Sequence, residues 1–199
     1  MLKNLILLHF FDIDEFLYIQ DEVPINTFLE NYTDQYSIFI NWRIFGDNNL
    51  SEVINDNYSI TRFTKCGKTL DPFGKHIINI KKIVSTPCEF INPHVVGFFK
   101  KIENEEKIFE LKVFSPSLEK SVENGKIFFD ENHFEKAELY HFKNKTFQER
   151  FKRCFQKPSV FYGNNKKQHV DIDSFKEDFE KYNINEMDNF NIVKILKES

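Results

Sequence analysis

The sequence has little cysteine, a single tryptophan and no long hydrophobic run. Three cysteines in 199 residues, with no Cys-x-x-Cys pair, indicate neither a disulfide framework nor a structural zinc site, and they suit a reducing cytoplasm. The apolar start, MLKNLILLHFF, is too short to span a bilayer, has no small-residue cleavage site, and is followed directly by acidic residues. We therefore expect neither a membrane-spanning segment nor a secretory signal there.

An overall excess of positive charge is also missing. The net charge is −4, so the chain lacks the electrostatic footprint of a nucleic-acid binder, and no nucleic acid is expected as a partner. The exception is local: residues 143–167 hold eight Lys or Arg against one acid, whereas residues 168–199 hold eight acids against four lysines. The basic segment is either a solvated helix face or a surface that faces phosphates or an anionic membrane, and both readings stay open.

What the chain does have is enough apolar sequence for a folded core. It is 41% hydrophobic and contains 24 phenylalanines, which favours a globular protein over a disordered one. Apolar runs predict strands, and phenylalanines at helical spacing predict helices near the C-terminus, while Pro24 is placed to begin a short helix. The predicted strands are 5–11, 36–42, 76–84, 94–102, 108–114 and 137–142, and the predicted helices are 23–32, 146–155, 174–182 and 189–199. The fold class is therefore α/β, a mixed sheet with a helical C-terminus.

The stretch HFFDIDEFLYI (9–19) places three carboxylates after an apolar strand. In an extended strand, Asp12 and Asp14 would project to the same side, at the carboxyl edge where open α/β sheets bind ligands. Neighbouring carboxylates repel unless a hard cation or a proton lies between them. The pattern therefore points to a Mn²⁺ or Mg²⁺ site, and such ions usually also bind substrate phosphates.

The same Asp-x-Asp spacing occurs in other kinds of site. An EF-hand loop would need an oxygen ligand at position 16 and glycine at position 17, where this chain has Phe16 and Leu17. A haloacid-dehalogenase-type phosphatase also follows a strand with Asp-x-Asp, but Phe16 stands where that group has Thr or Val. A strand end with solvated acids remains the plain structural alternative.

Further short segments follow this stretch in order along the chain. They are NWRIFGDNN (41–49), SITRFT (59–64), KHIINIKKIVSTP (75–87), INPHVV (91–96) and YHFKNKTFQERFKRCFQK (140–157). Together with HFFDIDEFLYI they resemble, in the same order, blocks of bacterial and viral glycosyltransferases of the GT-A type, near family 92 and the glycosyltransferase-2-like proteins. Thr61 stands where that group usually has an acid.

The resemblance implies a GT-A fold and transfer of a sugar from a nucleotide-diphosphate sugar to a polysaccharide or glycoconjugate acceptor. Asp12 and Asp14 would hold Mn²⁺ or Mg²⁺ against the donor diphosphate, with His141 as a further metal ligand. A buried, hydrogen-bonded histidine is the alternative for His141.

The resemblance also suggests roles for residues in the other segments. Asp47 is the predicted general base, which would deprotonate the acceptor hydroxyl. The predicted substrate-binding residues are Trp42, Phe45 and His94, although aromatic side chains are more often part of a core. The predicted contacts of the diphosphate or of an anionic acceptor are Lys143, Lys145 and Arg150.

In a GT-A fold the nucleotide-binding half precedes the metal motif, and two or three βα units need roughly 60 to 100 residues. Only eleven residues precede Asp12. We therefore expect residues 1–142 to form a metal and acceptor half, with 143–199 as a helical region packed on it, in an N-terminally truncated enzyme. An apolar edge at 5–11 would favour self-association or a second chain that completes the fold.

The alternative to an enzyme is a catalytically inactive remnant or a partner-dependent acceptor-binding subunit. The expected location is the cytoplasm, with peripheral contact at the inner face of the membrane.

Overall fold

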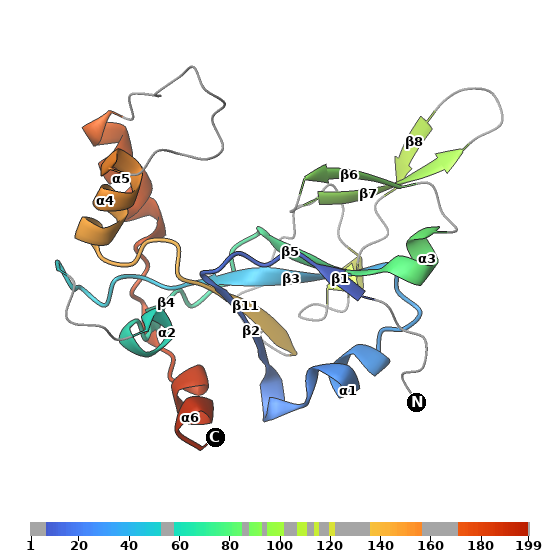
Figure 1. Ribbon diagram of the computed structural model, residues 1–199, viewed down its shortest axis with the longest axis horizontal. Helices are drawn as coiled ribbons and strands as arrows, with labels where there is room; N and C mark the ends of the chain where they lie inside the picture. Colours follow the sequence, from blue (N-terminus) through green and yellow to red (C-terminus); the bar gives the residue numbers. More distant parts are fainter. Residues whose placement is uncertain are drawn as a thin grey trace. The chain divides into compact units, whose positions relative to one another are not determined.

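The computed structural model describes residues 7–52, 58–84, 88–92, 95–101, 107–110, 114–115, 120–121, 136–156 and 171–198. Within these ranges the chain is a mixed α/β protein with a curled mixed sheet and helices, as Figure 1 shows. None of the helices in this part of the chain is long and apolar enough to cross a membrane. The predicted substrate residue His94 lies outside the described residues.

The chain divides into two compact units. Unit 1 comprises residues 1–43 and 69–140, and unit 2 comprises residues 44–68 and 141–199. The change after residue 140 lies close to the expected boundary at 142, but residues 44–68 also belong to unit 2. A strand pair explains this difference, because β4 (Lys65–Cys66) pairs antiparallel with β12 (Met187–Asp188). Each unit is described by itself below.

Unit 1 is built on the larger sheet, in which β5 pairs antiparallel with both β1 and β3. The strand order is β1-β5-β3-β11-β2, and β9 joins β3 in parallel, which makes the sheet mixed. The strands are β1 (Leu7–His9), β2 (Glu15–Ile19), β3 (Ser37–Ile44), β5 (Gly74–Asn79), β9 (Phe114–Ser115), β10 (Lys120–Ser121) and β11 (Ala137–His141). Strand β1, which falls in the strand predicted over 5–11, lies at one end of this order.

The middle strands are buried on both faces, which explains their continuous apolar runs. Every residue of β5 is buried, and in β3 only Trp42 is partly exposed. The strand predicted over 76–84 is shorter in the structure, because β5 ends at Asn79 and the chain continues into α3 (Ile80–Val84). A short apolar run does not distinguish strand from helix by periodicity alone, which accounts for the difference.

A separate three-stranded antiparallel sheet has the order β6-β7-β8. Its strands are β6 (Cys88–Asn92), β7 (Val95–Lys101) and β8 (Lys107–Glu110). The strands predicted at 94–102 and 108–114 are thus observed as β7 and β8.

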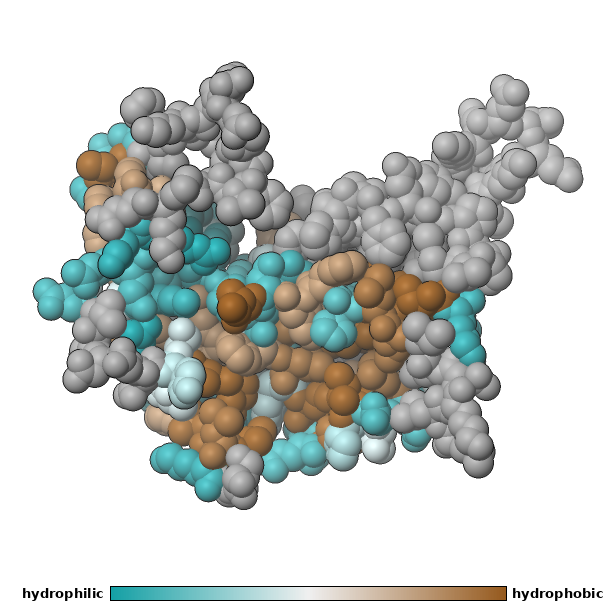
Figure 2. All heavy atoms as spheres, in the orientation of Figure 1, coloured by the Kyte–Doolittle hydropathy of each residue, from teal (hydrophilic) through white to brown (hydrophobic). Residues whose placement is uncertain are grey.

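The hydrophobic core of unit 1 lies between the sheet and α1 (Ile25–Glu30), which begins directly after Pro24 as predicted. Phe28 and Leu29 from this helix pack against Ile40 of β3 and Leu139 of β11. On the face shown in Figure 2, hydrophobic residues gather over this region of β1, β2 and α1. Burying each large side chain contributes about 1.5 to 3 kcal/mol, so this contact fixes the helix on the sheet.

Unit 2 contains the predicted C-terminal helices. They are α4 (Phe147–Gln156), α5 (Ile172–Tyr182) and α6 (Asn191–Glu198). A short helix of the same unit, α2 (Ser59–Arg62), precedes them in the chain. The short 3₁₀ helix η1 (Gln20–Glu22) belongs to unit 1. Phenylalanines at helical spacing join α4 to α5, and the ring of Phe147 lies edge-on to Phe175 and Phe179, with centroids 5.3 and 5.1 Å apart. The predicted amphipathic pattern therefore forms a helix pair.

A capping box fixes the start of α4. The Glu149 carboxylate accepts from the Thr146 backbone N–H at 3.1 Å, and the Thr146 hydroxyl accepts from the Glu149 N–H at 3.2 Å. Arg62 donates to the same carboxylate at 2.7 Å. Burial alone would raise the pKa of Glu149, but the hydrogen bonds from Arg62 and Thr146 outweigh it and lower that pKa below 4.5.

We expect Glu149→Gln to lower the free energy of unfolding by about 1 to 2 kcal/mol at pH 7. Because the folded-state pKa of Glu149 is lowered, its stabilising contribution is present above pH 4.5 and is lost as the pH falls below that value. Urea denaturation of the wild-type and variant chains between pH 7 and pH 3 measures the difference. Glu177→Gln, at an exposed position of α5, is the control; a Glu149→Gln deficit that did not shrink with falling pH would contradict this account.

Candidate functional site

The carboxylate turn, residues 12–15, connects β1 to β2 in unit 1. The Glu15 backbone N–H donates to the Asp12 carbonyl at 3.0 Å, so Ile13 and Asp14 occupy a tight turn and not an extended strand. Asp12 is exposed, whereas Asp14 is buried. The two aspartates therefore do not share one face of a strand, which differs from the expectation drawn from strand geometry. A turn presents Asp12 to solvent while holding Asp14 against the protein.

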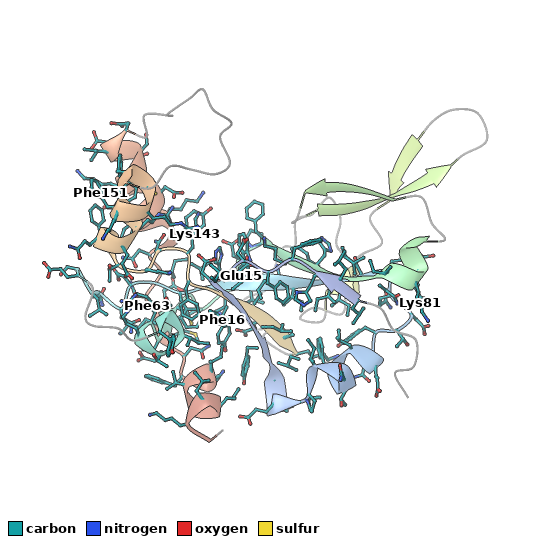
Figure 3. All side chains as sticks on the ribbon, viewed as in Figure 1. Glu15, Phe16, Phe63, Lys81, Lys143 and Phe151 are labelled. Carbon is teal, nitrogen blue, oxygen red and sulfur yellow. The ribbon has the colours of Figure 1, made fainter. Side chains whose placement is uncertain are left out.

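Glu15 anchors the carboxylate turn to the sheet. Its side chain is 0% exposed and stands at the start of β2 (Figure 3). One carboxylate oxygen accepts from the Asp12 backbone N–H at 2.8 Å, and the other accepts from the Trp42 indole N–H at 2.8 Å. Buried carboxylates are stable only when donors satisfy them, so these two bonds fix the turn to β3.

Lys75 brings a positive charge to the same place. Its side chain, from β5, is only 3% exposed, and its ammonium donates to Asp12 Oδ2 at 3.1 Å. The ammonium also lies 3.8 Å from Glu15 Oε1. Lys75 is not among the site residues predicted from the sequence, although a charged side chain directly before the predicted strand 76–84 was a usable signal.

The surroundings of Glu15 shift the pKa of its carboxyl in opposite directions. Burial raises the pKa of its carboxyl above 4.5, and this effect outweighs the hydrogen bond from Asp12 and the nearby Lys75 ammonium, which both lower the pKa. Glu15 therefore holds its proton to higher pH than an exposed glutamate. This property suits an anchoring acid better than a cation ligand, and leaves Asp12 and Asp14 as the candidate ligands.

The donor chemistry of the carboxylate turn fits a hard divalent cation. Mg²⁺ prefers carboxylate oxygens and commonly binds through one or two of them together with substrate phosphates. Asp12 offers an exposed carboxylate that already pairs with one cation, the ammonium of Lys75. Among the described residues no group of three or more His, Cys, Asp or Glu side chains is arranged to hold a metal ion. A cation at the turn would therefore need further ligands, as phosphates provide.

Trp42, predicted to face a sugar ring, belongs to this anchor. It is partly exposed, its indole N–H is engaged by Glu15, and its ring lies 6.3 Å from that of Phe73. The geometry thus gives Trp42 a positioning contact that sequence reasoning did not anticipate, because Trp42 and Glu15 are 27 residues apart in the chain.

Two predicted residues are buried in unit 2. Phe45 is 2% exposed, and its ring packs against Phe142 with centroids 4.6 Å apart, which is the arrangement of a core residue. His141, at the end of β11, is buried as well, and its carbonyl accepts from the Phe45 backbone N–H at 3.0 Å. The role of His141 as a metal ligand stays a prediction.

Asp47 lies in a polar loop of unit 2. One of its carboxylate oxygens, Oδ1, accepts from the Asn49 backbone N–H at 2.7 Å and from the Asn185 amide at 3.1 Å. Its own backbone N–H donates to Asn183 at 2.8 Å. A Cβ on Gly46 would collide with Asn185, so glycine is required for this close approach. Asn183 and Asn185 were missed by sequence reasoning because they lie far along the chain.

Two of the three predicted anion-binding residues, Lys143 and Arg150, pair with the same acid of α5, Asp178. Lys143 Nζ lies 3.8 Å from Asp178 and 3.2 Å from the centre of the Tyr182 ring. Arg150 pairs with Asp178 and hydrogen-bonds Asn144. The backbone of the third predicted residue, Lys145, is in the left-handed region, with φ 55°. Asp178 therefore partly neutralises Lys143 and Arg150.

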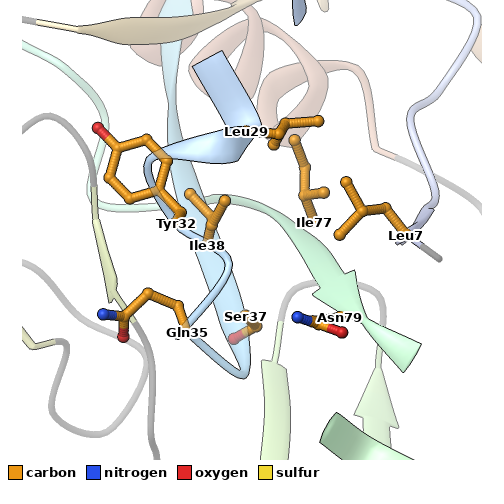
Figure 4. A pocket seen from close by; sticks show the side chains of 8 residues that line it. All are labelled: Leu7, Leu29, Tyr32, Gln35, Ser37, Ile38, Ile77 and Asn79. Carbon is orange, nitrogen blue, oxygen red and sulfur yellow. The ribbon is translucent and has the colours of Figure 1, made fainter. Parts of the chain in front are cut away.

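A small pocket lies in unit 1 at the far end of β5 from Lys75 (Figure 4). Its lining is mostly apolar, with the Ser37 hydroxyl and the Asn79 side-chain oxygen among the polar atoms. Neither of these two buried oxygens has a hydrogen-bond partner among the described residues. The pocket does not include the carboxylate turn.

Comparison with protein-family models and with curated proteins finds no match for this chain.

We expect Trp42→Phe to lower the free energy of unfolding by about 1 to 3 kcal/mol, because it removes a donor from a carboxylate that water cannot reach. Trp42 is the only tryptophan, so circular dichroism and not intrinsic tryptophan fluorescence must follow urea denaturation. Tyr58→Phe, on an exposed ring, is the control.

The same experiment in a Glu15→Ala background isolates the contact. If Trp42 acts through Glu15, Trp42→Phe costs less stability in that background than in the wild-type chain. Equal costs in both backgrounds would show that the indole matters for packing alone.

Proposed function

We propose that this chain is a metal-dependent glycosyltransferase of the GT-A type, or a fragment of one. It would transfer a sugar from a nucleotide-diphosphate sugar to a polysaccharide or glycoconjugate acceptor. The proposal rests on the ordered segments between residues 9 and 157 and on one structural observation. A buried glutamate fixes the carboxylate turn, and the exposed Asp12 in that turn already binds a cationic group, the Lys75 ammonium.

In this proposal, Asp12 and Asp14 hold Mn²⁺ or Mg²⁺, and a bound cation would neutralise the negative charge of a diphosphate leaving group. Glu15 does not bind the cation. Its part is to keep the turn in one conformation, through the Asp12 N–H and the Trp42 indole. Such preorganisation matters because a loosely held ligand loses affinity when it must be ordered on binding.

The other assignments remain proposals that come from the resemblance. They are Asp47 as general base, His141 as a further ligand, Lys143, Lys145 and Arg150 as anion contacts, and Phe45 and His94 as acceptor-site residues. A cytoplasmic location, peripheral membrane contact and a second chain that completes the nucleotide site belong to the same proposal.

A second candidate is a catalytically inactive remnant or an acceptor-binding subunit that depends on a partner. The surroundings of Asp47 favour it, because a buried carboxylate with two hydrogen bonds to Oδ1 resembles a structural turn residue more than a free base. The two candidates differ in one measurable property, which is metal-dependent binding of a nucleotide.

We expect the wild-type chain to bind a nucleoside diphosphate in the presence of Mn²⁺, and Asp12→Asn to weaken that binding at least about tenfold, the lower range for damage to a metal site. Calorimetric titration of UDP and GDP, with and without Mn²⁺, measures this binding. The nucleoside monophosphate CMP is titrated in the same way for comparison. Asp34→Asn is the matched control, because Asp34 is also an exposed aspartate of unit 1 that pairs with a lysine, Lys82.

Absence of Mn²⁺-dependent binding for all three nucleotides would contradict the enzyme proposal and favour the binding subunit. Equal losses in Asp12→Asn and Asp34→Asn would show that general surface charge, and not the carboxylate turn, binds the nucleotide.

A further inference from the structure

Lys75 has a position that the proposed function alone does not explain. Its ammonium is almost completely buried, yet its closest acceptor is the exposed carboxylate of Asp12, at 3.1 Å. A lysine that served only to neutralise the buried Glu15 would be expected to lie closest to Glu15, which is 3.8 Å away. The side chain instead reaches past its buried neighbour to the carboxylate that faces solvent.

This placement puts a lysine in competition with any cation at the carboxylate turn. Asp12 Oδ2 already accepts from Lys75, so a divalent ion must share or displace that contact. An ion at Asp12 would also lie within a few ångströms of a positive charge inside the protein, where like charges repel far more strongly than in water. A cation alone therefore meets a turn that is already partly neutralised.

A diphosphate changes this balance. Its negative oxygens can pair with the lysine ammonium while they also bind the cation, which releases Asp12 from Lys75. Lysine is well suited to this exchange, because its ammonium is a compact charge with three donors on a flexible stem.

We propose that Lys75 is a built-in counter-ion that makes cation binding at the carboxylate turn depend on a diphosphate. The inference rests on the proposed function and adds a positioning residue that couples the two ligands. In the absence of nucleotide, Lys75 holds Asp12 and keeps cation affinity low. When cation and diphosphate arrive together, Lys75 pairs with the diphosphate and Asp12 turns to the cation.

The test is titration with Mn²⁺, followed by electron paramagnetic resonance of the free ion, with and without UDP. The wild-type chain is expected to bind Mn²⁺ about tenfold or more tightly in the presence of UDP than in its absence. In Lys75→Met the affinity for Mn²⁺ alone should rise about tenfold, and the effect of UDP should shrink toward none. Lys82→Met, which removes a lysine paired with Asp34, should behave as wild type.

Two further variants separate this role from a structural one. Lys75→Arg keeps the charge and should preserve the dependence on UDP. Glu15→Gln leaves Asp12 as the remaining acid in contact with Lys75, so it should weaken Mn²⁺ binding. A purely structural role would make Lys75→Met and Glu15→Gln change Mn²⁺ affinity in the same direction, whereas the counter-ion role makes them opposite. If Lys75→Met does not fold, a gain in Mn²⁺ affinity in Glu15→Gln, or a loss of the UDP dependence in Lys75→Arg, still overturns the counter-ion role.

The outcomes distinguish this inference from the proposed function. Wild-type binding of Mn²⁺ and UDP with no gain in Lys75→Met, or a gain in Glu15→Gln, overturns the counter-ion role and leaves the proposed function standing. Binding of Mn²⁺ by Lys75→Met but not by wild type without UDP supports the role. Absence of Mn²⁺ binding in every variant, with and without UDP, overturns both.

Discussion

The candidate site depends on the hydrogen bonds that the buried Glu15 carboxylate accepts. Its side chain is closed to solvent, so its charge must be met by protein donors. Those donors are the Asp12 backbone, the Trp42 indole and, at longer range, the Lys75 ammonium. The Glu15 carboxylate thus connects the carboxylate turn to β3 and β5. The position of the exposed Asp12 is therefore set by a buried residue.

The sheet explains why these groups meet. Strands β3 and β5 pair antiparallel, with Ile40 opposite Lys75 and Asn41 opposite Gly74, which brings Trp42 and Lys75 to the same end of the two strands. Gly74 has to be glycine because a Cβ there would lie against the Ile40 carbonyl and 2.8 Å from the Asn41 Cα. The register of β3 and β5 therefore brings one lysine and one indole to the same carboxylate, that of Glu15.

Local sequence patterns predicted most of the elements but few of the contacts. The runs at 36–42 and 137–142 and the phenylalanine spacing of 146–155 and 174–182 marked strands and helices, because burial imposes periodicity on each element. The pairing of β4 with β12 and the contacts from Glu15 to Trp42 and from Asp12 to Lys75 span 27 to more than 100 residues, so no local pattern encodes them. The acids were found from their spacing after an apolar run, whereas their conformation as a turn, and the lysine beside them, required the register of the sheet.

The central claim is that the carboxylate turn is a preorganised cation site. Anomalous diffraction from crystals grown with Mn²⁺ and UDP tests it most directly, because it locates the ion without reference to activity. The account predicts an anomalous peak at coordination distance, about 2 to 2.2 Å, from a carboxylate oxygen of Asp12 or Asp14, with Glu15 still bonded to the Trp42 indole. Ordered Mn²⁺ bound only at other carboxylates, with the turn unchanged and Lys75 still paired to Asp12, would contradict it.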